Sequence, residues 1–539
     1  MKKSILFTIA ILGASTLCAQ KDSLNAVIQV ENEYNPVVTK AAKKGFTPST
    51  EQNNDNTPLE LEFSQKATPF TGFVGERDVK ELLPKQNGNY PGYARLGYGT
   101  GNNVDAKLSY LFNLSEKDKL NAVASLEGFN TKMDSPVGKW DSRFYSSWAG
   151  AEYSHKFDDL LLKSNVEWSN DVFNYNTSVP GDKQNVQRFH IGAGAVSSLT
   201  GPFSYEAGVR FTRNHYRHIP FLLTDEEAKK GHFSENIIGA DAEIKYELTD
   251  NTIRDIVAGV TLNNYSYSNL EGAKNFAELN INPAANIRID MFNIRVGAQL
   301  NMMTRGTFLA VAPDIYAEAA TSDAVTVYTS IKGGRTASGL KALEEVSPYW
   351  SIDRQPDPVY TVADITAGAR ISRAAFSANL YLGYAYTKDN LLDCDSYIEG
   401  VRNIGCNIVQ ENTARAYLGG RAGYDHKGWL KASAAAKYSY WKCDNRYLLG
   451  TKPEFEFELN GEARVLDDIY INATYSFATY AYDDPSLNKN ELNLRTTYKF
   501  ADRFSAFVEG NNLLNREYVK YAGYYEQGIN VLLGLSASF

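Results

Sequence analysis

The last ten residues of the chain, 530–539, constrain its fold most, because apolar and polar side chains alternate along them. Val531, Leu533, Leu535, Ala537 and Phe539 share one face, and Asn530, Gly534, Ser536 and Ser538 share the other. Side chains two residues apart project from the same side of a β-strand, so one side of this segment meets an apolar medium and the other meets water. The same alternation recurs from about residue 90 onward. We therefore expect an all-β chain that forms a transmembrane antiparallel β-barrel with a polar lumen.

The first 19 residues have the features of a secretory signal peptide. Residues 1–3 are Met-Lys-Lys, residues 4–17 are an apolar stretch too short to span a bilayer, and Ala19 is a small residue suited to cleavage. Lipidation of Cys18 is the alternative, although the leucine before it is larger than the residue usual there. A secreted chain with amphipathic strands and no long apolar helix is expected in the outer membrane of a Gram-negative bacterium.

Short and long polar connections alternate along residues 90–539, as they do in outer-membrane barrels. Short links are predicted at 156–159, 199–202, 248–252, 321–323, 372–374, 427–428, 466–468 and 501–503. Longer outer loops are predicted at 131–142, 174–185, 216–233, 333–358, 388–412, 442–453, 480–490 and 515–528. The trace gives about 22 strands, an even number that returns the C-terminus to the periplasmic side. Residues 388–412 leave room for one further hairpin.

Composition and motifs argue against catalysis and nucleic-acid binding. The net charge is −8 and no block of Lys and Arg stands out, so we expect no nucleic-acid partner. None of the six histidines lies in a recognisable catalytic string, and we expect no enzymatic activity and no cofactor. His215 and His218 have a spacing that suits metal ligands, but two ligands alone do not close a site, so no metal site is predicted.

Charged residues on three neighbouring strands are predicted to face the lumen, because they alternate with apolar residues. The candidates are Glu454, Glu456, Glu458, Glu462, Lys431, Lys437, Arg415 and Arg421. A ring of charge that selects a solute is one interpretation. A solvated wall braced by ion pairs across neighbouring strands is the favoured one.

Three cysteines lie in the predicted outer loops. Cys394 and Cys406 share one loop and Cys443 lies in another. Because the chain passes through an oxidising compartment, we predict a Cys394–Cys406 disulfide. The connectivity of three cysteines cannot be deduced from sequence, so this pairing stays open.

Residues 504–515 (FSAFVEGNNLLN), with Tyr518, Gly523 and the terminal Phe539, resemble the end of a TonB-dependent receptor barrel. The resemblance is tight over about 36 residues and loose over the rest of the barrel, and Glu526 and Gln527 depart from the family's frequent Pro-Gly. It implies passage of a nutrient or other solute across the outer membrane, contact with lipid, and Phe539 as a signal to the barrel-assembly machinery. The Tyr- and Asn-rich composition is similar to that of outer-membrane proteins of Bacteroidetes.

The family's plug domain has no counterpart of sufficient length in this sequence. Only residues 20–89 precede the first strand, fewer than a typical domain needs, and residues 47–68 are polar and punctuated by proline. We expect an extended segment in place of a plug. Residues 26–34 are a strand-like run that suits pairing with TonB, or with the barrel itself.

A barrel this wide has to be obstructed, because transporters of this size keep their lumen plugged. Loop 333–358, the N-terminal segment or a bound partner is predicted to do so, and residues 338–347 are expected to form one or two helical turns. The alternative function is a plugless barrel that serves as a scaffold or conduit subunit for a periplasmic or surface partner.

Overall fold

The computed structural model describes the chain from residue 90 onward. The described ranges are 90–133, 139–176, 183–197, 202–218, 231–248, 252–270, 272–352, 354–397, 404–426, 429–481 and 487–539. The signal peptide predicted at 1–19 and the extended segment predicted at 20–89 lie outside these residues, so both stay predictions.

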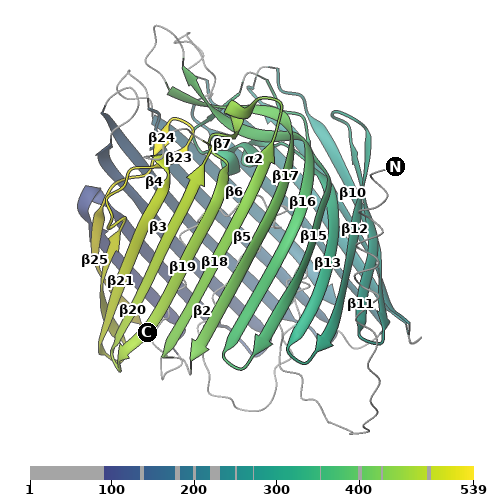
Figure 1. The fold of residues 1–539 in the computed structure, drawn as a ribbon, viewed down its shortest axis with the longest axis horizontal. Coiled ribbons are helices and arrows are strands. Elements are labelled where there is room, and N and C mark those ends of the chain that lie inside the picture. The colour runs from purple at the N-terminus through teal and green to yellow at the C-terminus, as the bar shows by residue number, and fades with distance from the viewer. Residues whose placement is uncertain are drawn as a thin grey trace. The chain divides into compact units, whose positions relative to one another are not determined.

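Twenty-two long antiparallel strands build the wall (Figure 1). They are β1 Gly92–Gly99, β2 Val104–Asn113, β3 Asp118–Met133, β4 Trp140–Lys156, β5 Leu160–Asn174, β6 Lys183–Ser197, β7 Phe203–Tyr216, β8 Phe233–Glu247, β9 Ile253–Ser268, β10 Phe276–Ile289, β11 Phe292–Met303, β12 Leu309–Ser322, β13 Val325–Thr336, β15 Val359–Arg373, β16 Phe376–Tyr397, β17 Ile404–His426, β18 Leu430–Lys442, β19 Pro453–Leu466, β20 Ile469–Tyr480, β21 Lys489–Ala501, β22 Phe504–Asn511 and β25 Asn530–Ser538. Shorter elements are η1 Thr100–Asn102, α2 Leu340–Val346, β14 Trp350–Ser351, η3 Arg446–Leu449, β23 Val519–Tyr521 and β24 Tyr524–Tyr525.

The sheet closes on itself through its first and last strands. β1 pairs with β2 on one side and with β25 on the other, so the ring has no free edge. At this seam the Gly92 N–H donates to the Phe539 carbonyl at 2.8 Å, and the Phe539 N–H donates to the Gly92 carbonyl at 3.0 Å. Closure pairs every strand edge of the wall, which is the requirement that makes barrels viable in a membrane. The predicted all-β fold and the count of about 22 strands are confirmed.

The connections alternate in length along the described wall, which defines a short-turn end and a long-loop end. Two-residue turns such as 323–324, 374–375 and 467–468 lie at the end that carries the C-terminus, and α2 lies toward the opposite end (Figure 1). Among the described residues no helix is long and apolar enough to cross a membrane.

The prediction of a loop or an extra hairpin at 388–412 is wrong. β16 and β17 continue through this region as one hairpin that extends beyond their neighbours, with a register shift between Thr387 and Asn390. Asp389 has a φ of 53°, a conformation that Asp adopts more readily than most residues. Polar composition suggested a loop, but the described part of the extension buries Leu391, Leu392 and Ile408, which are 7%, 0% and 6% exposed.

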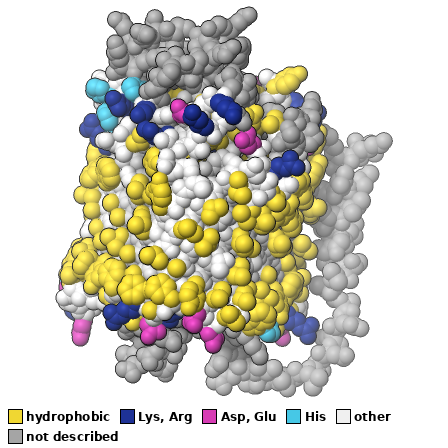
Figure 2. Space-filling view, turned by 90° about the vertical axis from the view of Figure 1, so that its left-hand side faces the viewer, with side chains coloured by type: hydrophobic (Ala, Val, Ile, Leu, Met, Phe, Trp, Pro, Cys, Tyr) yellow, Lys and Arg dark blue, Asp and Glu magenta, His cyan; other side chains and the backbone are white. Residues whose placement is uncertain are grey.

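An apolar belt covers the outside of the wall, as alternation predicts. On β17, β18 and β19 the outward side chains Leu418, Tyr438 and Leu459 are 59%, 51% and 45% exposed. Figure 2 shows hydrophobic side chains spread over the middle and lower part of the barrel and charged ones collected at its rims. This distribution suits a wall that contacts lipid.

On the inner face, aromatic rings lie over glycines of the neighbouring strand. A Cβ at Gly383 would come within 2.3 Å of the Tyr417 ring, and one at Gly419 within 2.6 Å of the Tyr381 ring. The rings fill the space that the missing side chains leave, so these glycines are required by close packing.

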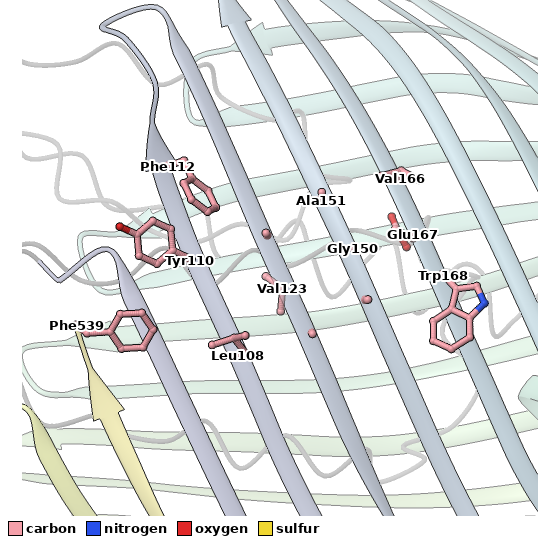
Figure 3. Close-up of a pocket in the computed structure, with 13 residues that line it drawn as sticks. Leu108, Tyr110, Phe112, Val123, Gly150, Ala151, Val166, Glu167, Trp168 and Phe539 are labelled. Carbon is pink, nitrogen blue, oxygen red and sulfur yellow. The ribbon is translucent and has the colours of Figure 1, made fainter.

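The outer wall is hollowed beside the seam (Figure 3). The lining of this hollow includes the small residues Ala122, Ala124, Ala149 and Ala151. Tyr110 and Phe539 border one side of it. The rings of Tyr110 and Phe539 stack with centroids 6.0 Å apart. Because the hollow faces outward and its lining is almost entirely apolar, it suits lipid chains better than a water-soluble solute.

Candidate solute pathway and its cover

The connection between β13 and β15 folds over the barrel mouth at the long-loop end. We call residues 337–352 and 354–358 the cover segment. The helical turns predicted at 338–347 are confirmed as α2, whose Leu340 and Leu343 are buried. Leu343 and Trp350 are 0% and 2% exposed, which is the burial of a protein core and not that of an ordinary surface loop.

Buried polar contacts anchor α2 to β6, β7 and β8. The Glu344 carboxylate accepts hydrogen bonds from the Arg188 guanidinium, at 2.6 Å from Nη2 and 3.1 Å from Nε, and from the Tyr216 hydroxyl. The Leu340 N–H donates to Glu235 Oε1 at 3.0 Å. Glu235 thereby partners a backbone donor in the first turn of the helix, where such donors lack a partner within the helix.

The cover segment also attaches to the opposite side of the ring. β14 pairs in parallel with β17, with Trp350 opposite Cys406 and Ser351 opposite Asn407. Asp357 and Gln410 exchange two hydrogen bonds of 2.7 Å. β14 is not one of the 22 strands of the wall. Among those strands β6 is the sixth and β17 the sixteenth, so they lie ten positions apart, nearly opposite each other in the ring. The cover segment therefore crosses the mouth.

Part of the loop between β22 and β25 joins the cover from a third direction. The ring of Tyr524 stacks on that of Tyr349 with centroids 3.7 Å apart and planes 5° apart. The Tyr524 hydroxyl accepts from the Asn176 N–H at 3.2 Å, and the Ala522 N–H donates to Asp393 Oδ2 at 3.1 Å. These contacts tie the C-terminal loop to β16 and to the chain that follows β5.

One apolar core unites these segments. Its buried members come from the cover segment, the extended tip of β16 and β17, the C-terminal loop and the upper ends of β3 to β8. They are Met133, Trp140, Phe173, Val186, Tyr216, Phe233, Leu340, Leu343, Tyr349, Trp350, Ile352, Leu391, Cys406, Ile408, Ala522 and Tyr524. An apolar core built from the chain's own residues therefore lies at the long-loop mouth.

Burial changes the pKa of the Glu344 carboxyl group, which anchors α2. Glu344 is largely shielded from water, with 13% of its side chain exposed, and this burial raises the pKa of its carboxyl above the usual range. The Arg188 charge and the hydrogen bonds from Arg188 and Tyr216 oppose that rise, because they favour the ionised form. Burial likewise raises the pKa of the Tyr349 hydroxyl, which stays protonated at neutral pH.

The sequence-predicted lumen residues share the face opposite to the exposed apolar belt. Lys437 stands directly across from Glu456, and their Nζ and Oε2 atoms are 3.6 Å apart. Arg415 reaches Asp364 at 3.8 Å, and its guanidinium lies 4.8 Å and 5.0 Å from the ring centroids of Tyr417 and Trp441. Accessibility from a water-filled lumen remains a prediction for these side chains.

The other candidates are less closely associated. Glu458 accepts a hydrogen bond of 2.5 Å from Asn460, Lys431 stands across from Glu462, and Arg421 stands across from Ala435. Glu454 falls at a register shift between Pro453 and Phe455. The structure brings Lys437 and Glu456 together, and it does not gather the eight candidates into a single site.

Ion pairs recur along the inner face far beyond the predicted strands. They are Arg95–Asp105, Arg188–Asp171, Arg210–Asp241, Arg295–Asp314, Arg370–Glu318, Lys489–Glu491 and Arg495–Glu509. The distribution favours the braced wall over a selective ring of charge. Arg188, Glu235 and Glu344 were not predicted from the sequence, although the alternation of charge on β6 and β8 was a signal for the first two.

In the described part of the chain, the cysteines and histidines are not gathered into a metal site. Register places Cys394 opposite Asn407 and Cys406 opposite Asp395, so the two side chains point to opposite faces of this ladder. The predicted disulfide stays a prediction, and it requires this ladder to shift by one residue. The rings of His215 and His232 lie 5.7 Å apart, and no group of three or more potential metal ligands occurs in the described part of the chain.

The fold is shared with receptors of known structure. The siderophore receptor PirA from Acinetobacter baumannii superposes with a TM-score of 0.66 at 9% identity, over 83% of this chain and 80% of that one. A ferric enterobactin receptor mutant from Pseudomonas aeruginosa gives 0.64 at 12% identity, over 83% and 81%. The copper transporter OprC gives 0.62 at 13% identity, over 83% and 80%.

These likenesses define the class of fold, a 22-strand barrel like that of the TonB-dependent receptors of Gram-negative outer membranes. At such low identity they establish the fold alone. No protein-family model matches the sequence, and no curated protein matches it.

Proposed function

We propose that the chain passes a solute across the outer membrane and that the cover segment gates its long-loop mouth. One observation carries the proposal, namely a receptor-type barrel whose mouth is crossed by a segment anchored on opposite sides of the ring. The anchors at Glu344 and Asp357 are polar contacts that water or a solute can replace, which suits a segment that moves. The likeness to siderophore receptors and a copper transporter supports metal chelates as the first solutes to test.

Uptake in living cells tests this proposal. The full chain is produced in a Gram-negative host that lacks its own iron receptors, with and without TonB, and uptake of a panel of radioactive iron and copper chelates is measured. We expect the chain to confer TonB-dependent uptake of at least one chelate. Outer-membrane insertion of the full chain without uptake of any tested chelate, in either host, counts against this proposal.

A scaffold or conduit subunit is the second candidate, and the apolar core of the cover favours it. Trp350, Tyr349 and Tyr524 pack there as tightly as in a domain interior, an arrangement that suits a permanently closed mouth. Purification from native membranes in a gentle detergent separates the two functions. A stable stoichiometric subunit supports the scaffold, and a barrel that purifies alone supports the transporter.

A further inference from the structure

A buried arginine on the inner face of β17 lacks hydrogen-bond partners among the described residues. Arg415 is 7% exposed, and its position has the inward parity of β17, opposite to that of the exposed Leu418. The guanidinium carries five N–H donors, yet none of them donates to a described residue, and its Nε is fully buried. Buried polar groups are nearly always hydrogen-bonded, because leaving one unpaired costs free energy. Arg415 therefore keeps donors that the acceptor atoms of a ligand can satisfy.

Two aromatic rings hold this guanidinium in place. Its Cζ lies 4.8 Å from the ring centroid of Tyr417 and 5.0 Å from that of Trp441. The rings are themselves fixed, since the Tyr417 hydroxyl donates to Asp364 Oδ1 at 2.5 Å and Trp441 Nε1 donates to the Pro453 carbonyl at 3.1 Å. A guanidinium whose plane is fixed in advance loses little freedom when its donors bind an acceptor.

The carboxylates beside these cations lie beyond hydrogen-bond distance. Arg415 Nη2 is 3.8 Å from Asp364 Oδ2, and Lys437 Nζ is 3.6 Å from Glu456 Oε2. By contrast, the inner-wall pair formed by Arg95 closes to 2.9 Å. The longer pairs balance charge without using the donors of the two cations, so these donors remain available to a solute.

Further cations share the inner face of β17 and β18. The inward positions of residues 413–426 and 429–442 carry Arg415, Arg421, Lys431 and Lys437. The only acid at these described inward positions is Asp425, which lies 3.9 Å from Lys431 at the short-turn end. Ser439 is 2% exposed and stands opposite Tyr417, between the levels of Arg415 and Lys437. The two strands therefore place an excess of positive charge on the inner face.

These cations lie below one anchor of the cover segment and suit a carboxylate. Gln410 of β17 exchanges hydrogen bonds with Asp357 of the cover segment, and Arg415 follows five residues nearer the short-turn end. The planar fork of a guanidinium matches the two oxygens of a carboxylate, which it binds through parallel N–H donors. An uncharged solute would leave the positive charges unbalanced, and a cationic one would be repelled.

We infer that Arg415 and Lys437 bind a carboxylate of the transported solute on the inner wall below the cover segment. Arg415 takes the two carboxylate oxygens, Lys437 supplies a second positive charge, and the Ser439 hydroxyl supplies a further donor. The inference rests on the proposed passage of a solute, and it narrows the class of solute to organic carboxylates, including metal chelates that carry free carboxylates.

Equilibrium binding to the purified full-length barrel in detergent tests the inference. The probe is radioactive succinate at neutral pH, where both of its carboxyl groups are ionised, and its uncharged diamide, succinamide, is a competitor of matched size. We expect saturable binding of succinate that succinamide does not displace. Absence of saturable binding, or displacement by succinamide, would overturn the inference. Inorganic phosphate that displaces the probe at lower concentration than unlabelled succinate does would assign the site to phosphate and contradict the carboxylate assignment.

A charge variant locates the site. R415Q is expected to weaken succinate binding by at least about tenfold, because it removes charge-assisted hydrogen bonds to the carboxylate. The matched control R370Q removes another inner-wall arginine, whose Cζ lies 4.3 Å from the Tyr328 ring centroid but whose donors are used by Glu318 and Tyr316. This control should bind succinate as the wild type does. Unchanged binding in R415Q, or an equal loss in both variants, would contradict the assigned site.

Urea denaturation of the same proteins separates a binding role from a structural one. Because Arg415 donates no hydrogen bond to a described residue, R415Q should leave the urea midpoint unchanged or higher, whereas R370Q should lower it. A midpoint lowered as much in R415Q as in R370Q would make Arg415 a brace of the wall and contradict the inference. A barrel that binds succinate without conferring uptake in cells contradicts the proposed passage alone, and one that confers uptake without binding succinate contradicts this inference alone.

Discussion

At the scale of single residues, the inner wall depends on glycines that accept a ring from the next strand. Gly383→Ala places a methyl group 2.3 Å from the Tyr417 ring and 2.5 Å from the Ile365 carbonyl, so the ring and the backbone must both move. We expect a loss of about 1–3 kcal/mol in the free energy of unfolding, measured from urea denaturation of the purified barrel. Gly461→Ala on β19 is the control, because nothing lies within 4 Å of its new Cβ. Equal stability of the two variants would contradict this packing.

The contacts that anchor α2 through Glu344 give a second prediction at this scale. Glu344→Ala leaves the Arg188 guanidinium with Asp171 and Ser169 as partners and the Tyr216 hydroxyl without its acceptor, so the cover should open more readily by about 1–3 kcal/mol. Amide hydrogen exchange over residues 340–346 measures this opening and should accelerate by about tenfold or more. Lys341→Ala, an exposed change on the same helix, should leave the exchange rates unchanged. Unaltered exchange in both variants would show that Glu344 does not anchor the helix.

The terminal aromatic carries a third prediction. Phe539 closes the β1–β25 seam through its backbone and stacks on Tyr110, and its resemblance to the family's assembly signal motivates Phe539→Ala. We expect a lower amount of barrel in the outer membrane with folding in detergent preserved, measured by membrane fractionation beside refolding yield. Outer-membrane levels equal to those of the wild type would remove the assembly role.

At the scale of elements, the strands were predictable from the sequence, but the position of the cover segment across the mouth was not. Alternation on a strand such as 454–465 is a local signal, because each side chain's face depends only on its neighbours. The anchors of α2 are remote, since Glu344 and Arg188 are 156 residues apart and Leu340 and Glu235 are 105 apart. Sequence therefore placed a helical turn at 338–347 and left open whether it lies on the surface or across the mouth.

Strand register gives a prediction at this scale. Glu458 and Leu459 are adjacent on β19 and point to opposite faces, and Leu459 is 45% exposed on the apolar belt. In a background with the native cysteines replaced by serine, Glu458→Cys should react with a water-soluble maleimide in membranes, while Leu459→Cys should be protected by lipid. The reverse pattern would place β19 one residue out of register.

At the scale of the whole molecule, we infer that the cover segment obstructs the long-loop mouth. Thr336 and Val359 are paired directly across β13 and β15, so an Asn-Gly turn can replace residues 337–358 without moving either strand. This variant removes the cover and keeps the described wall, which makes the obstruction measurable apart from the fold.

Single-channel conductance in planar bilayers is the most direct test, made on barrels that lack residues 20–89 so that only the cover differs. With the cover in place we expect no open channel, and with residues 337–358 replaced by Asn-Gly we expect a large, steady conductance, because a lumen of this strand number is wide when empty. A large conductance with the cover intact, equal to that of the variant without it, would contradict the claim that the cover segment obstructs the mouth.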